Sequence, residues 1–248
     1  MDALRKKTAI VTGASRGIGA AAAELLAESG CSVVANYLHS ERRAYELCDA
    51  LTRRGFSCAP FRADVSVRDE AFALAAFALD RFGGADILVN NAGIAQQKLF
   101  TDITPAEWER MFAVSVGAAF HCTQAVLPYM LRQKSGCIVN VSSIWGITGA
   151  SCEVHYSAAK AALIGMTKAL AKELGPSGIR VNCVAPGAAD TDMNSGLSAG
   201  DIELLREEIP LGRLGSAREI AQCIRFLCFE EAAYVTGQVI SPNGGMVV

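Results

Sequence analysis

The chain has 248 residues, of which 51% are hydrophobic and 19% are charged. That composition supplies enough apolar side chains for a deep core and argues against disorder, and the length fits one large α/β domain. The formal net charge is −2 and no block of basic residues is present, so the electrostatics give no support to nucleic acid or a membrane surface as a partner.

The N-terminus and the cysteines bear on the cellular compartment. The first seven residues are charged and lack the apolar core of a signal peptide, and no uninterrupted apolar stretch reaches the roughly 18 residues that span a bilayer. The nine cysteines are scattered without a CxxC pair, and the three histidines have no metal-ligand spacing. We therefore expect a cytoplasmic protein with reduced thiols, no membrane segment and no metal.

Short apolar runs alternate with helical patterns along the whole chain. Strands are predicted at Thr8–Val11, Ser32–Asn36, Ser57–Arg62, Ile87–Val89, Gly136–Val141, Arg180–Val184 and Gln238–Ile240. Helices are predicted at Ile18–Ser29, Glu41–Arg54, Arg68–Phe82, Pro105–Arg132, Val154–Leu174 and Ala217–Phe229. The strands are continuously apolar, as in a parallel sheet that is covered on both faces. The expected fold is α/β, a single doubly wound Rossmann-type parallel sheet of about seven strands flanked by helices on both faces, in one domain spanning residues 1–248.

The segment 188–215 interrupts this alternation, between the sixth strand and the last long helix. A short helix is predicted within it, around Asp201–Glu208. Because a loop of this length inside a compact domain is usually functional, we expect it to act as a lid over the substrate.

The first predicted strand leads into a glycine-rich turn, Thr12-Gly13-Ala14-Ser15-Arg16-Gly17-Ile18-Gly19. Gly13 permits a tight turn, Gly17 lets the backbone approach a ligand, and Gly19 allows close packing of helix on strand. The N-terminus of the following helix would present free N–H groups to a diphosphate. The turn therefore predicts a dinucleotide site, with a glycine turn that serves packing alone as the alternative.

This spacing, Gly-x-x-x-Gly-x-Gly, resembles the first turn of the short-chain dehydrogenase/reductase family, and the resemblance extends over essentially the whole chain. It implies that Ser15 and Ile18 also contact the cofactor, that Asp64 and Val65 lie beside the adenine, and that Thr191 binds the nicotinamide carboxamide. Further contacts are implied for the segment after the fourth strand and for the segment before Thr191, namely Asn91, Ala92, Gly93, Pro186 and Gly187.

The end of the second strand bears on the choice of nicotinamide cofactor. Sites that prefer NAD usually carry an acid there, against the ribose 2′-hydroxyl, and here the position is Tyr37. No carboxylate would repel a 2′-phosphate, Arg16 supplies a planar cation suited to phosphate, and Ser40 supplies a hydroxyl. The pattern favours NADPH over NADH, with Arg16 as a plain solvated turn residue as the alternative.

Tyr156 and Lys160 lie four residues apart at the start of a predicted helix, so they share one face. A phenol has a pKa near 10, and a nearby ammonium is expected to lower it. Ser143 follows a buried strand, at the edge where a parallel sheet presents its ligand crevice. The resemblance implies that Ser143, Tyr156 and Lys160 are catalytic.

In the implied reaction Ser143 and Tyr156 hydrogen-bond a carbonyl oxygen, NADPH donates hydride to the carbon, and Tyr156 protonates the forming alkoxide. Ser115 stands where many relatives carry an asparagine that holds a water for proton relay from Lys160. Serine is shorter and has a single donor hydrogen, so we expect a relay through Ser115 and an extra water. The alternatives are a coincidental Tyr-x-x-x-Lys pair and a Ser143 that caps its strand.

Within the family the motifs are most similar to bacterial 3-oxoacyl-acyl-carrier-protein reductases, on the strength of four segments: the glycine-rich turn 12–19, Thr191-Asp192-Met193, 210–215 and 234–238. The resemblance implies a carrier-bound 3-oxoacyl thioester as substrate and a homotetramer formed through residues 105–132, 154–174 and 238–248. Of the two basic positions that hold the acidic carrier at the active-site entrance, Lys134 is retained and Ser177 replaces the other. Two alternatives stay open: reduction of another ketone (small, cyclic, or carried on a protein side chain), or a non-catalytic NADPH-binding protein.

Overall fold

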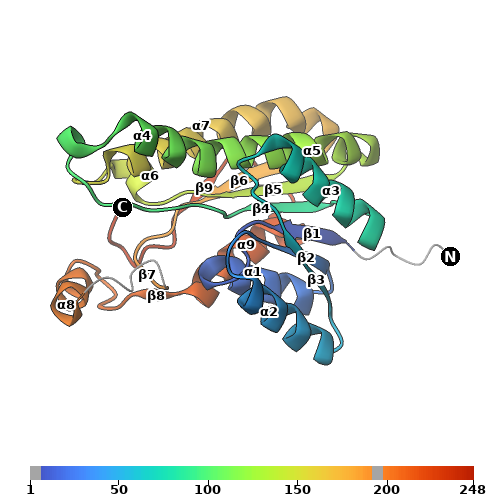
Figure 1. Ribbon diagram of the computed structural model, residues 1–248, viewed down its shortest axis with the longest axis horizontal. Coiled ribbons are helices and arrows are strands. Elements are labelled where there is room, and N and C mark those ends of the chain that lie inside the picture. Colours follow the sequence, from blue (N-terminus) through green and yellow to red (C-terminus); the bar gives the residue numbers. More distant parts are fainter. Residues whose placement is uncertain (1–6, 192–197) are drawn as a thin grey trace.

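The computed structural model describes residues 7–191 and 198–248, and at its centre lies a seven-stranded sheet (Figure 1). The strand order is β3-β2-β1-β4-β5-β6-β9, and every neighbouring pair is parallel. The strands are β1 Thr8–Val11, β2 Ser32–Tyr37, β3 Ser57–Arg62, β4 Ile87–Asn90, β5 Gly136–Val141, β6 Ile179–Val184 and β9 Val239–Ile240. The predicted parallel sheet of about seven strands is confirmed.

Helices cover both faces of this sheet (Figure 1). One face carries α1 Gly17–Glu28, α2 Glu41–Arg53 and α9 Ala217–Cys228, and the other carries α3 Arg68–Phe82, α5 Ala118–Gln133 and α7 Val154–Leu174. Each face has its own apolar core, because strand side chains alternate between the two faces: Ala9 and Val11 pack toward α1, whereas Ile10 packs toward α3. The doubly wound architecture is thus confirmed.

The chain changes direction across the sheet between β1 and β4. From β1 it winds outward to β2 and β3, then returns to β4 on the other side of β1 and continues outward through β5 and β6. In such sheets a crevice opens at this reversal, beyond the carboxyl ends of the strands. The glycine-rich turn follows β1 and the segment 91–93 follows β4, so both lie at that crevice.

The predicted long helix over 105–132 is built of three parts. These are α4 Pro105–Phe112, a π-helical turn Ala113–Gly117 that contains Ser115, and α5. By length and composition the stretch 105–133 could cross a membrane. Its apolar side chains, however, include Cys122, Val126 and Met130, which are buried in the same core as α3. One face of the stretch therefore packs into the core beside α3.

Several short elements escaped prediction. They are the helix α6 Trp145–Thr148, the parallel pair β7 Ala189–Asp190 and β8 Gly215–Ser216, and 3-10 turns at Phe100–Asp102, Gly175–Ser177 and Glu230–Ala232. The predicted short helix in 188–215 is α8 Ala199–Glu207. It starts two residues earlier than predicted because Ser198 and Asp201 form a capping box. The β7–β8 pair closes the two ends of the segment 188–215 onto each other.

Candidate active site

Two adjoining cavities lie along the carboxyl ends of β1, β4, β5 and β6. The first, about 530 Å³, is lined by Ser143, Tyr156 and Lys160, and we call it the Tyr156 cavity. The second, about 480 Å³, is lined by the glycine-rich turn, and we call it the glycine-turn cavity. Both are lined by Ile18, Asn91, Gly93, Ala95 and Thr191. The shared wall makes them one elongated crevice, which suits an extended ligand.

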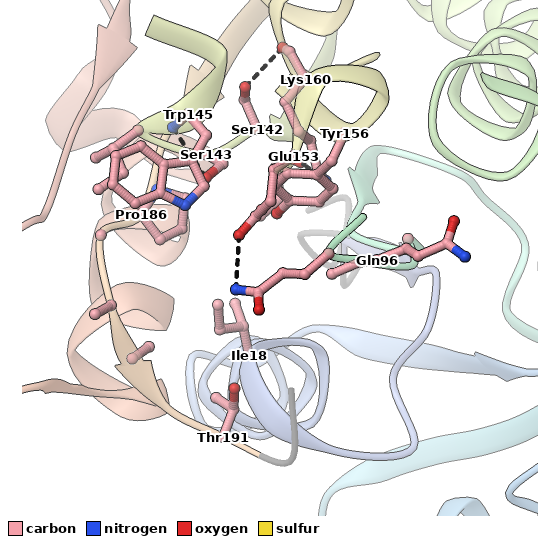
Figure 2. Close-up of a pocket in the computed structure, with 18 of the residues that line it drawn as sticks. Ile18, Gln96, Ser142, Ser143, Trp145, Glu153, Tyr156, Lys160, Pro186 and Thr191 are labelled. Carbon is pink, nitrogen blue, oxygen red and sulfur yellow. Dashed lines mark hydrogen bonds between the residues drawn. The ribbon is translucent and has the colours of Figure 1, made fainter. Parts of the chain in front are cut away.

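The structure brings Ser143, Tyr156 and Lys160 together at the inner end of the Tyr156 cavity (Figure 2). All three are buried, with exposed fractions of 7%, 7% and 4%. The ammonium of Lys160 lies 5.6 Å from the centre of the Tyr156 ring and donates a hydrogen bond of 2.9 Å to the carbonyl of Val141. The Ser143 hydroxyl accepts a hydrogen bond of 3.2 Å from the backbone N–H of Trp145.

The electrostatics of Tyr156 differ from the sequence-based expectation. Burial disfavours the phenolate and raises the pKa of Tyr156 to about 12, although a hydrogen bond with Ser143 acts in the opposite direction. Burial also lowers the pKa of Lys160 to about 8, because the ammonium is costly to desolvate. The expected lowering of the Tyr156 pKa by Lys160 is therefore wrong for the chain by itself, since burial dominates and Lys160 is not among the groups that shift the pKa of Tyr156.

Ser142 and Gly146 support this arrangement, and neither was singled out as functional from the sequence. The hydroxyl of Ser142 donates a hydrogen bond of 2.7 Å to the carbonyl of Lys160 (Figure 2). A methyl group at Gly146 would lie 2.7 Å from that hydroxyl oxygen and 2.8 Å from the backbone of Lys160. The end of β5, helix α6 and helix α7 thus meet at a close backbone contact that fixes where Lys160 stands.

The glycine-rich turn lies at the start of α1, where the expected phosphate site would be. Gly13, Ser15, Arg16, Gly17 and Ile18 all line the glycine-turn cavity. Gly19 does not, but a side chain there would collide with the carbonyl oxygen of Gly13, so its role is close packing. The helix N-terminus has no side-chain cap and no acidic residue in its first turn, which leaves its N–H groups available to a ligand.

Polar side chains tie the turn to its neighbouring strands. The hydroxyl of Thr12 accepts hydrogen bonds from the backbone N–H groups of Asn91 and Ala92, at 2.9 and 3.0 Å. Asn36, in β2, accepts a hydrogen bond from the N–H of Gly13 at 3.3 Å and donates one to the carbonyl of Ala63 at 3.1 Å. Sequence reasoning gave no role to Asn36, and it named Thr12 only as the first residue of the turn, because the sequence does not reveal the hydrogen-bond partners of either side chain.

The far end of the glycine-turn cavity is lined by Ser40, Asp64 and Val65, as expected, together with His39 and Arg110. The side chain of Tyr37 does not line it. Instead Tyr37 is buried, and its hydroxyl donates a hydrogen bond of 3.3 Å to Glu41. The structure therefore places two arginines, Arg16 and Arg110, at this cavity, but no tyrosine.

The remaining expected cofactor residues line the same crevice. Asn91, Ala92 and Gly93 border the glycine-turn cavity, and Pro186, Gly187 and Thr191 border the Tyr156 cavity. Asp192 and Met193, which belong to the expected carboxamide-binding segment, lie outside the described residues. Asp201 and Leu205 of α8 line the outer part of the Tyr156 cavity, so the segment 188–215 reaches the site that it was expected to cover.

Two expectations concern individual residues near the site. Ser115 is buried in the π-helical turn with its hydroxyl 3.9 Å from the sulfur of Met111, and no direct hydrogen bond joins it to Lys160 in the described part of the chain, so the relay through Ser115 and an extra water stays a prediction. Lys134 and Ser177 precede β5 and β6, at the amino ends of these strands, whereas Ser143 follows the carboxyl end of β5. Within one chain neither residue is at the mouth of the Tyr156 cavity, so their expected role at the entrance would require the expected homotetramer and stays a prediction.

The outer wall of the Tyr156 cavity is lined by residues that no sequence motif predicted, among them Gln96, Trp145 and Glu153 (Figure 2), together with Gln97. No signal in the sequence connects them, because Gln97 and Glu153 meet only in the folded chain, 56 positions apart.

Over residues 7–191 and 198–248, no group of three or more His, Cys, Asp and Glu side chains forms a metal site. None of the nine cysteines, all of which lie in the described part of the chain, forms a disulfide bond.

Comparison with known proteins identifies the family. Residues 13–247 match the profile of a family described as enoyl-(acyl carrier protein) reductase. The chain is 45% identical over 240 residues to an uncharacterized oxidoreductase, YmfI, of Bacillus subtilis, covering 96% of this chain and 98% of that protein. It is 41% identical over 240 residues to the 3-oxoacyl-acyl-carrier-protein reductase FabG of Staphylococcus aureus, covering 97% and 98%. It is also 43% identical over 249 residues to a 3-oxoacyl-acyl-carrier-protein reductase of Synechocystis, covering both chains fully. The chain therefore belongs to the short-chain dehydrogenase/reductase family and is an oxidoreductase that acts on CH–OH and C=O groups.

Proposed function

We propose that this protein reduces the ketone of a 3-oxoacyl thioester with NADPH. The observation that carries the proposal is the meeting of Ser143, Tyr156 and Lys160 in a cavity that continues into the glycine-turn cavity. Such a crevice would place a carbonyl group beside two hydroxyls and next to an extended dinucleotide. The names of two relatives that match nearly full length support the choice of a 3-oxoacyl substrate.

The described residues fit NADPH. The uncapped N-terminus of α1 faces the glycine-turn cavity and suits the diphosphate. Arg16 and Arg110 line the end of that cavity beyond β2, where a 2′-phosphate would gain charge-assisted hydrogen bonds. The one carboxylate that lines this cavity in the described residues, Asp64, accepts a hydrogen bond of 3.0 Å from the N–H of Ser66. NADPH, once bound, would supply the hydride.

The side chains of the Tyr156 cavity would perform the rest of the reaction. Ser143 and Tyr156 hydrogen-bond the substrate oxygen, and Tyr156 transfers its phenolic proton to the oxygen as negative charge develops there. A phenol with a pKa near 12 is a reluctant donor, so the developing alkoxide and the Lys160 ammonium must offset the burial. Lys160 can do so only while it is protonated, and its lowered pKa makes this dependent on pH.

A matched pair of variants tests the proposal. Tyr156→Phe should reduce kcat for acetoacetyl thioesters by about 10²- to 10⁴-fold, the usual loss when a positioned proton donor is removed. Tyr234→Phe, at a fully exposed tyrosine, should leave it unchanged. The assay follows NADPH oxidation at 340 nm. The proposal fails if Tyr156→Phe keeps wild-type turnover while its melting temperature shows that it is folded.

The substrate panel separates the alternatives. Crotonyl thioesters test enoyl reduction, which the family description names, and cyclic and small ketones test the wider family chemistry. Turnover of ketones but not of acetoacetyl thioesters would support a different carbonyl substrate, and cofactor binding without turnover of any compound would support a non-catalytic role. A carrier-bound substrate, a homotetramer and a cytoplasmic location belong to the proposal as inferences from the resemblance.

A further inference from the structure

The acidic residue Glu153 stands at the edge of the catalytic group. It occupies the N-cap position of α7, three residues before Tyr156, and its backbone carbonyl accepts a hydrogen bond of 2.8 Å from Ser157. Its carboxylate does not cap the helix. The side chain is half-buried and lines the Tyr156 cavity instead (Figure 2). Helix geometry thus leaves this charge available to whatever enters the cavity.

The partner of Glu153 is held in place by a chain of hydrogen bonds. Gln97 donates to one carboxylate oxygen of Glu153 at 3.2 Å, the contact drawn as a dashed line in Figure 2. The neighbouring Gln96 donates to Glu107 at 2.8 Å, and its carbonyl oxygen lies 2.9 Å from the ring nitrogen of the buried His155. Loop and helix are therefore locked together on either side of the cavity mouth.

The charge balance of the cavity is negative at its mouth. Among the described residues that line it, the carboxylates are Glu153 and Asp201, and the only cation is Lys160. Lys160 is directed into the protein, toward the carbonyl of Val141. The undescribed residues 192–197, within the segment 188–215, contain no lysine or arginine in the sequence. Among the described residues, an anionic group on the substrate would find no cation at the mouth to pair with.

We propose that Glu153 determines specificity, by selecting ketones that carry a hydrogen-bond donor close to the carbonyl and by rejecting ketones that carry a carboxylate there. This inference rests on the proposed reductase function and refines its substrate class. A carboxylate offers about four acceptor positions, and Gln97 occupies one. An amide N–H, such as that of an amide-containing thioester arm, could occupy another, whereas a second carboxylate would be repelled.

Three substrates of almost the same size test the charge preference. Acetoacetamide carries a donor, methyl acetoacetate carries neither donor nor charge, and acetoacetate carries a negative charge. For the wild-type protein we expect kcat/KM to fall in that order. Glu153→Gln, which keeps the shape and removes the charge, should raise kcat/KM for acetoacetate by about tenfold, and should change methyl acetoacetate by less than about twofold. Glu173→Gln, at an exposed position of the same helix, should change none of them.

The outcomes are distinguishable. If Glu153→Gln alters all three substrates by a common factor, or leaves acetoacetate unchanged, Glu153 has no role in specificity. If the wild-type protein reduces none of the three with either cofactor, the assay with acetoacetyl thioesters decides the proposed function separately, and binding of the three compounds decides the charge preference. Trp145 lines the cavity and is one of two tryptophans, so its fluorescence in a Trp108→Phe background reports binding. Tighter binding of acetoacetamide than of acetoacetate, lost in Glu153→Gln, would support the inference, and equal affinities would overturn it.

Discussion

The ammonium of Lys160 is buried in the protein interior, where a charged group loses its hydration. Only 4% of the residue is exposed, and its hydrogen bond to Val141 offsets part of the desolvation that lowers its pKa to about 8. The folded chain therefore binds this proton less tightly than the unfolded chain, in which the lysine has the ordinary pKa of 10.5. The side chain proposed to assist Tyr156 thus reduces the stability of the fold around neutral pH.

The sign of this effect gives a prediction for Lys160→Met. Between pH 8 and 10.5 the unfolded chain binds more protons, so the free energy of unfolding of the wild-type protein contains a contribution that rises with pH across this window. Below pH 8 the penalty is on the order of 3 kcal/mol. Lys160→Met removes it and loses one hydrogen bond, so we expect a net gain of about 2 kcal/mol at pH 7.

Urea unfolding at pH 7 and pH 9.5 checks this, with the exposed Lys168→Met as control. The advantage of Lys160→Met over wild type should shrink toward pH 9.5 and that of the control should not. Above pH 10 the buried Tyr156 should lower stability in both proteins, because the folded state then holds the phenolic proton more tightly. An advantage independent of pH would contradict the assignment.

At this scale the sequence predicted which residues gather and missed how they behave. The four-residue spacing of Tyr156 and Lys160 needs only helix geometry, so their shared face could be inferred. The pKa values follow from burial by the whole fold, which no spacing reports. For the same reason Tyr37 was expected to contact the cofactor, whereas its ring is buried and its hydroxyl donates a hydrogen bond to Glu41.

Among the elements, α6 and α7 make a backbone contact that depends on Gly146. Gly146→Ala would place a methyl group 2.8 Å from the backbone of Lys160 and displace α6 or the start of α7. We expect a loss of about 1–3 kcal/mol in unfolding free energy and a lower kcat. Gly165→Ala is the control, since it lies in α7 with no atom within 4 Å of the added methyl group. That variant should gain about 0.5–1 kcal/mol and keep its activity.

Melting temperature and kcat of the two variants measure the difference. A Gly146→Ala protein as stable and active as wild type would show that the contact is not needed.

The long elements were predictable to within a residue or two, as with β2 and β4, because continuous apolar runs mark buried strands. The two-residue strands β7 and β8 could not be predicted, because they exist only through their pairing with each other.

For the molecule as a whole, cofactor binding should appear as stability. If Arg16 contacts a 2′-phosphate, NADPH should have a lower Kd than NADH and should raise the melting temperature more at equal concentration. A ligand that binds only the folded state adds about 2.7 kcal/mol to the free energy of unfolding when its concentration is 100 times its Kd. Arg16→Ala should weaken the binding of NADPH by about ten- to a hundredfold and leave the affinity for NADH nearly unchanged. Arg132→Ala, exposed at the end of α5, serves as the control. Equal stabilisation by both cofactors in the wild-type protein would contradict the preference for NADPH.

The order of strands and loops along the chain determined how much of the site could be predicted from the sequence. Strand ends at one edge of a parallel sheet meet in space, so Ser143, the glycine-rich turn and Asn91 could be assigned to one crevice before any coordinates. Lys134 and Ser177 show the limit, because they precede β5 and β6 within one chain, and the sequence does not reveal which residues a second subunit would bring to the crevice.

The short pair β7–β8 has a consequence for how this chain could diversify. Because the N–H of Gly215 bonds to the carbonyl of Ala188 at 3.0 Å, the two ends of the intervening stretch lie side by side. Exchanging the part of that stretch beyond Thr191 for one of another length or composition need not move β6 or α9. New substrate ranges could thus be acquired by transplanting one loop, with Ser143, Tyr156, Lys160 and Thr191 kept.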